Sequence, residues 1–146
     1  MVKTIDPSVQ RDAFFAVIRV ADKLNAEFAA LFREYGLTQA QFNVLRILVT
    51  GPKRGVSCQE IGDGLVQRVP DVTRLIDRMT SEQLVERARC PEDRRVVHVR
   101  ITSKGRKLCE SLYEPVARLH QEQFAHMTKK SVRELNGLLR EALSQD

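Results

Sequence analysis

The chain has 146 residues, a length that suits one compact domain with an added dimerisation element, and 42% of them are hydrophobic, which excludes a disordered protein. Aromatic residues make up only 5% and tryptophan is absent, so helices packed on aliphatic side chains are favoured over an all-β fold. The 24 basic and 19 acidic residues give a net charge of +5, which suits a polyanionic partner without requiring one.

Cysteine content and the N-terminal segment indicate the cellular compartment. Cys58, Cys90 and Cys109 are an odd number of thiols at wide spacings, so neither a disulfide framework nor a paired C-x-x-C metal site is available. Charged side chains near the N-terminus interrupt the apolar core that a signal peptide needs, and no later segment approaches an apolar run of about 18 residues. We therefore expect a cytoplasmic protein with no membrane partner.

A long amphipathic helix is predicted over residues 8–34, because apolar side chains recur there at spacings of three and four, with charged residues between them. The apolar side chains are Phe14, Ile18, Ala21, Leu24, Phe28 and Leu31. At a rise of about 1.5 Å per residue the helix would be about 40 Å long, more than the diameter of a small domain. Part of its apolar face is therefore expected to pack on another chain.

Two capping boxes mark the starts of the next helices. Thr38 and Gln41 form a Thr-x-x-Gln box after Gly36, which is expected to end the first helix. Ser57 and Glu60 form a Ser-x-x-Glu box that opens a short third helix. The inward-facing side chains of these two helices are Phe42, Leu45, Leu48, Ile61 and Leu65.

A fourth helix is predicted over about 69–80, with Pro70 in its first turn. Its inward stripe consists of Val72, Leu75, Ile76 and Met79. Its outward side carries Asp71, Arg74, Asp77 and Arg78, with Thr73 flanking them. The opposed stripes predict a helix with one buried and one polar face.

The apolar period then changes from that of a helix to that of a strand, so residues 84–89 and 96–101 are predicted as two strands joined by a turn at 90–94. His98 alternates outward in the second strand. Between residues 87 and 106 seven basic residues stand against two acidic ones, a net charge of +5 over twenty residues. The segment is thus predicted to be a β-hairpin with a basic tip.

From Thr102 onward the helical period returns. Pro115 is expected to kink this helix, and a Ser-x-x-Glu box at Ser131 and Glu134 is expected to open the last one. These C-terminal helices are neutral overall and more apolar than a monomer needs, which again indicates a dimer.

Two short helices followed by a hairpin with an arginine-rich loop are typical of a winged helix-turn-helix. In that plan the second helix enters the major groove, where arginine and threonine contact bases, and the hairpin tip lies along the backbone or in the minor groove. Ser57 and the amides after it suit a phosphate. The sequence therefore predicts a mainly α fold with a small β-hairpin, and double-stranded DNA as the partner.

Three motifs resemble the signature of the MarR (multiple antibiotic resistance regulator) family. They are V-T-R-L-I-D-R at 72–78, L-V-x-R at 84–87, and D-R-R at 93–95 followed by V-x-I-T-x-x-G at 99–105. Their order and spacing are those of the family, and the resemblance covers nearly the whole chain. Residues 66–70 depart from the family pattern, in which Gly and Ser or Thr are more common in this turn.

The resemblance implies which residues contact DNA. They are Thr73, Arg74 and Arg78 on the fourth helix, Arg94 and Arg95 at the hairpin tip, and Asp93 beside them. Ser57, at the start of the third helix, and Arg68 are further expected DNA contacts. We expect Asp93 to hold a neighbouring arginine in a bidentate geometry, because an unpaired carboxylate beside phosphates would be repulsive.

By the same resemblance, residues 1–146 form a single domain, with a winged helix-turn-helix at about 38–101 and dimerisation helices at about 8–34 and 103–144. The implied function is that of a homodimeric repressor on a palindromic operator with half-sites about one DNA turn apart. Family members are usually released by a small molecule, often aromatic and anionic. Candidate contacts for such an effector are Phe15, Arg19, Phe42, Tyr113 and His120.

Two alternatives stay open. A redox-responsive regulator would use Cys90, which lies near several arginines, or Cys58 at a helix start, since both settings stabilise a thiolate. A helical interaction module would instead use the basic hairpin to bind protein or RNA, and would show neither strong salt dependence nor a palindromic preference.

An enzyme is not expected, because the chain contains no G-x-S-x-G, H-E-x-x-H or G-x-x-x-x-G-K-[ST] motif. His120 and His126 are six residues apart and so do not share a helix face, whereas Glu122 and His126 are more simply a solvated pair than a metal site. We expect no catalytic residue, no metal and no cofactor.

Overall fold

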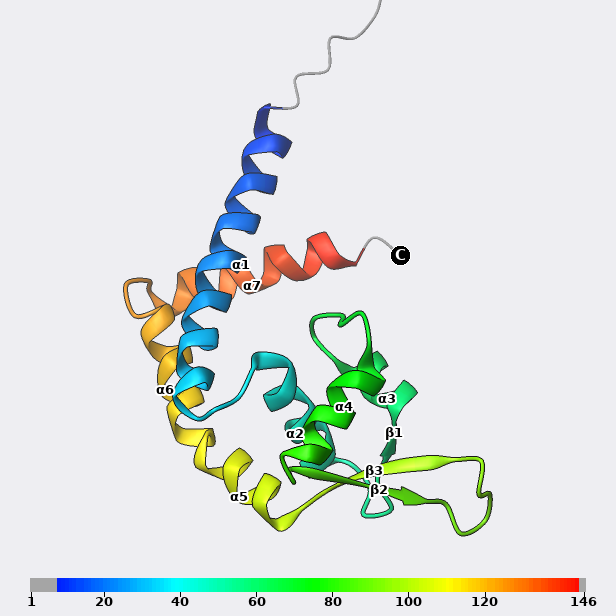
Figure 1. Cartoon of the computed structure of the whole chain (residues 1–146). Helices are drawn as coiled ribbons and strands as arrows, with labels where there is room; N and C mark the ends of the chain where they lie inside the picture. Colours follow the sequence, from blue (N-terminus) through cyan, green and yellow to red (C-terminus); the bar gives the residue numbers. More distant parts are fainter. Residues whose placement is uncertain (1–7, 145–146) are drawn as a thin grey trace, which may run out of the picture. The chain divides into compact units, whose positions relative to one another are not determined.

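Helix α1 (Ser8–Glu34) is the first element of the computed structural model, which describes residues 8–144 (Figure 1). The helix has the bounds expected from its apolar spacing. It ends ahead of Gly36, whose φ of +70° lies in the left-handed region that glycine tolerates at helix ends. Only Phe28 and Phe32 of this helix are buried, and their rings stack with centroids 5.7 Å apart.

The chain divides into two compact units. The first ends at Tyr113 and the second begins at Glu114. The first contains α1, the helix pair and the hairpin that the sequence predicts to bind DNA, and it is described first.

Both predicted capping boxes are present. Gln41 N donates to Thr38 Oγ1 at 3.2 Å at the start of α2 (Gln39–Thr50). Glu60 N donates to Ser57 Oγ, also at 3.2 Å, at the start of α3 (Cys58–Gly64). The apolar residues assigned inward on these two helices lie in the core, with Leu65 buried directly after α3.

Helix α4 (Val72–Ser81) begins later than predicted. Its N-cap is Asp71, whose Oδ1 accepts a hydrogen bond from Arg74 N at 3.0 Å, so Pro70 precedes the helix instead of lying in its first turn. The carboxylate of Asp71 can satisfy a free N–H group of the first turn, and this cap places the helix start after the proline. Residues 68 and 69 therefore belong to the loop before α4.

The sheet has three strands, not the two that were predicted. Its order is β1-β3-β2, all antiparallel, with β1 at Val56–Ser57, β2 at Val85–Arg89 and β3 at Val97–Ile101. The two-residue β1 pairs with β3, placing Ser57 opposite His98. Because β3 is the central strand and α3 contacts it, His98 is buried, and its predicted outward orientation is wrong.

In the core of the first unit, one face of α4 packs against α3 and strand β2, and α2 packs against α3 and β3. The fully buried side chains of this core include Val44, Leu45, Ile61, Ile76, Met79 and Val99. Two of these, Ile76 and Met79, belong to the predicted inward stripe of α4. This packing sets which face of α4 remains exposed to solvent.

The C-terminal helices are α5 (Ser103–Ser111), α6 (Tyr113–Gln123) and α7 (Lys129–Leu143). The helical path is interrupted at Leu112, one turn before Pro115, because proline lacks the N–H that would bond to the carbonyl of Ser111. Helix α7 is capped by Thr128, whose Oγ1 accepts from Ser131 N at 3.1 Å, so the predicted start at Ser131 is wrong by one turn. None of the helices within residues 8–144 combines the length and apolar character that crossing a membrane requires.

Candidate nucleic-acid interface

Helix α4 presents a polar face to solvent. Thr73, Arg74, Asp77 and Arg78 are exposed, whereas Ile76 and Met79 on the opposite side are fully buried. The buried pair fixes the rotation of the helix about its own axis. The three predicted DNA-contact residues of α4 therefore lie on one accessible surface.

The sheet anchors the middle of α4 through an arginine. Arg87 on β2 forms an ion pair between its Nη1 and Asp77 Oδ1, and its Nη2 lies 3.5 Å from the backbone carbonyl oxygen of Thr73. Sequence reasoning counted Arg87 only as part of the basic surplus of the hairpin. The pairing joins residues ten positions apart in different elements, and no periodicity signals it.

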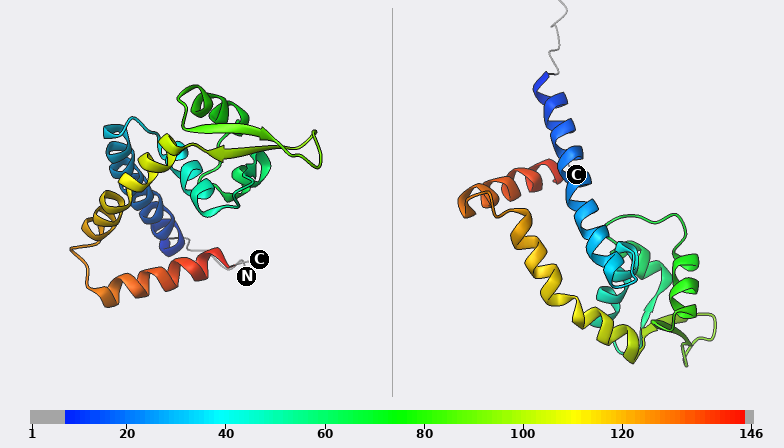
Figure 2. Two further views of the ribbon diagram at one scale, coloured as in Figure 1. Left: turned by 90° about the horizontal axis from the view of Figure 1, so that it is seen from below. Right: turned by 60° about the vertical axis from the view of Figure 1, so that its left-hand side comes forward.

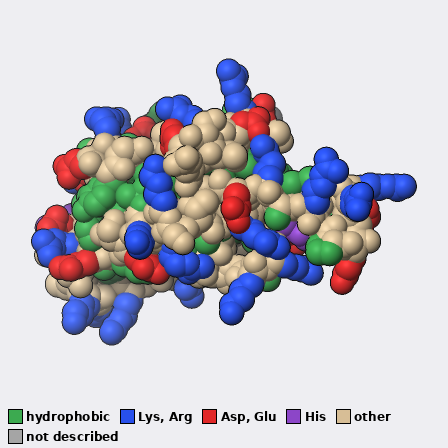
Figure 3. Space-filling view, turned by 60° about the horizontal axis from the view of Figure 1, so that its bottom comes forward, with side chains coloured by type: hydrophobic (Ala, Val, Ile, Leu, Met, Phe, Trp, Pro, Cys, Tyr) green, Lys and Arg blue, Asp and Glu red, His purple; other side chains and the backbone are tan. Residues whose placement is uncertain are grey.

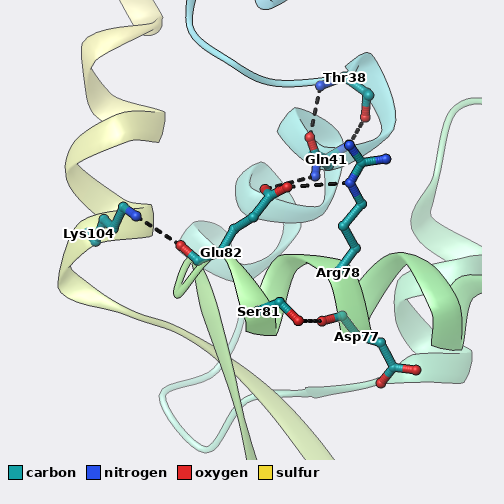
Figure 4. A network of polar contacts seen from close by, with 7 residues as sticks. All are labelled: Thr38, Gln41, Asp77, Arg78, Ser81, Glu82 and Lys104. Carbon is teal, nitrogen blue, oxygen red and sulfur yellow. Dashed lines mark hydrogen bonds and ion pairs between the residues drawn. The ribbon is translucent and has the colours of Figure 1, made fainter.

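The C-terminal end of α4 is held by a second polar network (Figure 4). Glu82 caps the helix, and its side chain accepts a hydrogen bond from Gln41 Nε2 of α2 at 3.1 Å. Its backbone carbonyl accepts from Lys104 Nζ of α5 at 2.9 Å. Nearby, Thr102 Oγ1 donates to the carbonyl of Gln83 at 2.7 Å, so α4 is tied at this end to both α2 and α5.

Arg78 takes part in this network as well as in the exposed face. Its Nε lies 3.4 Å from Glu82 Oε1, and 70% of its side chain remains exposed. The sequence identified Arg78 as a DNA contact through the family motif. It did not identify Glu82 as a partner, although the two residues are four positions apart on the same helix.

The loop between β2 and β3 projects beyond the rest of the first unit, as the left-hand view of Figure 2 shows. Arg94 and Arg95 are exposed in it, and no ion pair within residues 8–144 involves either one. Figure 3 shows several Lys and Arg side chains at this projecting end, with Asp and Glu side chains among them. Although Glu92 and Asp93 lie in the same loop, the two guanidinium groups form no ion pair within the described residues and are accessible to a phosphate.

Asp93 orders the loop through its backbone. Its Oδ1 accepts a hydrogen bond from Arg95 N at 3.0 Å, and its carbonyl oxygen accepts from Val96 N at the same distance. Cys90 N donates to the carbonyl of Val96 at 2.9 Å and closes the loop. The contact that the structure shows for the Asp93 carboxylate is thus with a backbone amide, and not the expected bidentate pairing with a guanidinium.

Ser57 and Arg68 lie at the two ends of the α3 region. Ser57 is the N-cap of α3, and its backbone N–H donates to Glu60 Oε2 at 2.9 Å. This hydrogen bond, together with the one to the Ser57 side chain, holds the pKa of Glu60 below its usual value, so the capping carboxylate is ionised at neutral pH. Arg68 is exposed and lines a shallow hollow with Asp63 and Val72.

The five candidate effector residues have different surroundings. Phe15 and Arg19 are exposed on α1, whereas Phe42 is buried, with its ring centroid 4.6 Å from that of Phe32. The Phe42 ring therefore packs in the core. In the second unit, His120 lines an apolar hollow together with Phe124, Val132 and other residues.

Tyr113 and the three cysteines bear on effector and redox chemistry. Tyr113 is half-exposed, whereas Cys109, one helical turn earlier, is fully buried. Burial raises the pKa of the Cys109 thiol, which keeps it protonated at neutral pH and disfavours thiolate chemistry. Cys58 and Cys90 are half-buried, and all three thiols are free. Within residues 8–144, no three His, Cys, Asp or Glu side chains are grouped closely enough to hold a metal ion.

Comparisons with known proteins agree with this geometry. The model of the MarR family matches residues 35–96, which include the helix pair and most of the hairpin. The chain is 30% identical to the HTH-type transcriptional repressor IacR of Pseudomonas putida, over 86% of this chain and 74% of that protein. It is 32% identical to the multiple antibiotic resistance protein MarR of Escherichia coli, over 86% of this chain and 89% of that protein. IacR is named as a transcriptional repressor, and neither name is that of an enzyme.

Solved structures of similar proteins cover almost the whole chain. A mutant MarR from Escherichia coli complexed with operator DNA superposes with a TM-score of 0.81 at 27% identity, covering 96% of this chain and 99% of that one. BpsR of Bordetella bronchiseptica, whose DNA binding is regulated by 6-hydroxynicotinic acid, superposes with a TM-score of 0.79 at 25% identity, covering 90% and 93%. The mainly helical winged-helix fold expected from the sequence is thereby confirmed.

Proposed function

The chain belongs to the MarR family of DNA-binding transcriptional regulators, and from this premise we propose that it is a homodimeric repressor of a palindromic operator whose DNA binding a small molecule relieves. The observation that carries the proposal is the exposed polar face of α4 together with a projecting loop whose two exposed arginines form no ion pair within residues 8–144. A rigid helix with threonine and arginine suits the major groove, and arginines on a narrow loop suit the minor groove or phosphates.

The DNA contacts proposed for this surface fall into three groups. Thr73, Arg74 and Arg78 of α4 contact base edges and nearby phosphates, Arg94 and Arg95 reach the minor groove or backbone with Asp93 ordering their loop, and Ser57 and Arg68 contact phosphates. Helix packing supports the first group, because burial of Ile76 and Met79 directs the opposite face outward. The exposure of both loop arginines supports the second.

Dimerisation is proposed through residues 8–34 and 103–144. Large apolar side chains on α1 are exposed in a single chain, among them Phe14 at 60%. On α7, Leu138 is 65% exposed and Leu143 is 82% exposed. Apolar surface of this extent is costly in water and favours association with a second copy. A two-fold dimer would present two α4 helices about one DNA turn apart, which requires a palindromic site.

Repression and release by an effector are proposed by analogy with two relatives. IacR is named a repressor, and 6-hydroxynicotinic acid, which regulates BpsR, is a small aromatic acid. We propose an effector of that chemical class for this chain. Phe15, Arg19, Tyr113 and His120 are exposed aromatic or basic side chains of the kind that would bind it, whereas Phe42 would act only through core packing.

The test is selection of binding sites from a random duplex pool with the purified full-length protein, followed by binding at rising salt concentration. We expect enrichment of a palindrome with half-sites one turn apart, and an affinity that falls steeply with salt. Sedimentation at the binding concentrations should give the mass of a dimer. Sequence-blind binding without an enriched site would contradict the proposal of an operator-specific repressor.

A further inference from the structure

The side chain of Glu82 contacts two donors at once (Figure 4). Its Oε1 lies 3.4 Å from Arg78 Nε, and its Oε2 accepts a hydrogen bond from Gln41 Nε2 at 3.1 Å. The backbone carbonyl of the same residue accepts from Lys104 Nζ at 2.9 Å. The residue is therefore fixed from α4 itself, from α2 and from α5.

Gln41 gives this carboxylate a rigid support. Its side chain is only 2% exposed, and its Oε1 accepts a hydrogen bond from Thr38 N at 2.9 Å. With the amide oxygen engaged by Thr38, the amide nitrogen must face Glu82. The position of the Glu82 carboxylate is thus set by a buried residue.

The contact with Glu82 uses only one of the three guanidinium nitrogens of Arg78. Nε faces the carboxylate, and no hydrogen bond of the Nη nitrogens is found within residues 8–144. These two nitrogens form a planar fork that can donate two parallel hydrogen bonds, the geometry in which arginine contacts O6 and N7 of guanine. An arginine restrained at Nε loses less rotamer freedom on binding than an unrestrained one.

We propose that Glu82 is a positioning residue for DNA recognition: supported by Gln41, it orients Arg78 so that the Nη fork meets a base edge, and so contributes to discrimination between DNA sequences. This inference rests on the proposed function, in which Arg78 faces operator DNA. The negative charge of Glu82 also weakens the attraction of Arg78 to phosphates, which favours the base contact over a sequence-independent one.

The chemistry of the site requires glutamate. A carboxylate offers one oxygen to Arg78 and the other to Gln41, whereas the amide of a glutamine has a single acceptor oxygen and satisfies only one of these donors. Aspartate keeps the charge but is one methylene shorter, so it does not span both donors. The two substitutions therefore separate the effect of charge from that of geometry.

The experiment measures the ratio of affinities for the selected operator and for a scrambled duplex of equal length, at one salt concentration. We expect Glu82→Gln and Glu82→Asp each to lower this ratio by about 10-fold, the loss of one base contact. In an Arg78→Ala background, either substitution should change the ratio by less than about 2-fold, because Glu82 acts through Arg78. Glu86→Gln on β2 is the matched control for the lost charge, and thermal unfolding of every variant verifies its fold.

Each other outcome overturns the inference in an identifiable way. If Glu82→Gln and Glu82→Asp fold and keep the ratio of operator to scrambled affinity, Glu82 serves only as a helix cap and does not position Arg78. A third outcome is that Glu82→Gln binds the operator more tightly than Glu86→Gln does, while the ratio of operator to scrambled affinity stays unchanged. This result would mean that Glu82 weakens the contact of Arg78 with DNA instead of orienting it. An operator that Arg78→Ala still discriminates fully would leave the proposed function intact and remove this inference alone, whereas absence of any selected operator would remove both.

Discussion

Helix α4 and the loop between β2 and β3 carry the same chemical group, the arginine guanidinium, on supports of different rigidity. On α4 the helix is tied to the sheet by Arg87 and to α2 by Glu82, and Arg78 is paired. In the loop, Arg94 and Arg95 are exposed without an ion pair within residues 8–144. A guanidinium that is held in one geometry before binding favours a partner at one position, whereas a guanidinium without such restraint can bind phosphates at many positions. We infer that α4 supplies discrimination and the loop supplies salt-dependent affinity.

Removing both loop arginines should have the largest effect. For Arg94→Ala/Arg95→Ala we expect weaker binding to operator and scrambled DNA alike, by about 10- to 100-fold at low salt, because both duplexes offer the same phosphates. The slope of log affinity against log salt should become less steep by about 2. Fluorescence anisotropy at several salt concentrations measures both quantities. Arg46→Ala/Lys53→Ala, at exposed positions outside the proposed DNA-contact and dimerisation residues, is the charge-matched control, and loss of operator binding alone would contradict the comparison.

Arg74 tests whether the helix alone is sufficient to confer discrimination. Its backbone N–H is bonded to Asp71, but no ion pair within residues 8–144 involves its side chain. For Arg74→Ala we expect a loss of about 1–3 kcal/mol on the operator and little change on scrambled DNA, if the residue contacts a base. Competition titrations with both duplexes measure the difference. A uniform loss would assign Arg74 to a phosphate and place it with the loop arginines.

Arg87 tests the tie between α4 and the sheet. For Arg87→Ala we expect a loss of about 0.5–1 kcal/mol of folding free energy, since the ion pair with Asp77 is partly exposed, and a 3- to 5-fold weaker operator affinity, on the order of the same free energy. Arg87→Lys should not restore binding, because one ammonium does not reproduce the fork that reaches both Asp77 and the Thr73 carbonyl. Urea unfolding and operator titration measure the two effects. Full operator affinity in the alanine variant would show that burial alone positions α4.

Gln83 should give the smallest effect, and in the stabilising direction. It follows the α4 cap and has a φ of +60°. This left-handed conformation is unfavourable in free energy for any residue other than glycine. For Gln83→Gly we expect a gain of about 0.5–1 kcal/mol in the free energy of unfolding. Gly36→Ala, at φ of +70°, is the matched control and should lose stability. A gain in stability with poorer operator discrimination would mean that the Gln83 side chain takes part in recognition.

Most helices could be predicted from the sequence because their signals are local. The bounds of α1 follow from the spacing of apolar residues, and the starts of α2 and α3 follow from capping boxes that lie within four residues. Local signals also misled where two residues competed for one role. Thr128 and Ser131 both suit an N-cap, and the structure uses Thr128.

The sequence predicted which residues of the candidate site face solvent, but not which side chains hold α4 in place. The exposed faces of α4 and of the loop follow from residue order and from the resemblance to a family. The contacts of Arg87 with Asp77, and of Gln41 with Glu82, join residues 10 and 41 positions apart. No periodicity reports on such pairs, so the residues that hold the helix in place were not identified.

The sequence by itself determined the helical fold class, the order of elements and the polar face of α4, since apolar periodicity and caps act over a few residues. Only the tertiary structure decided the rest. It placed the short strand β1 beside β3, which buried His98, and it paired Arg78 with a Glu82 carboxylate held by a buried amide. Strand pairing and polar networks depend on groups brought together by packing, and that proximity is a property of the folded chain.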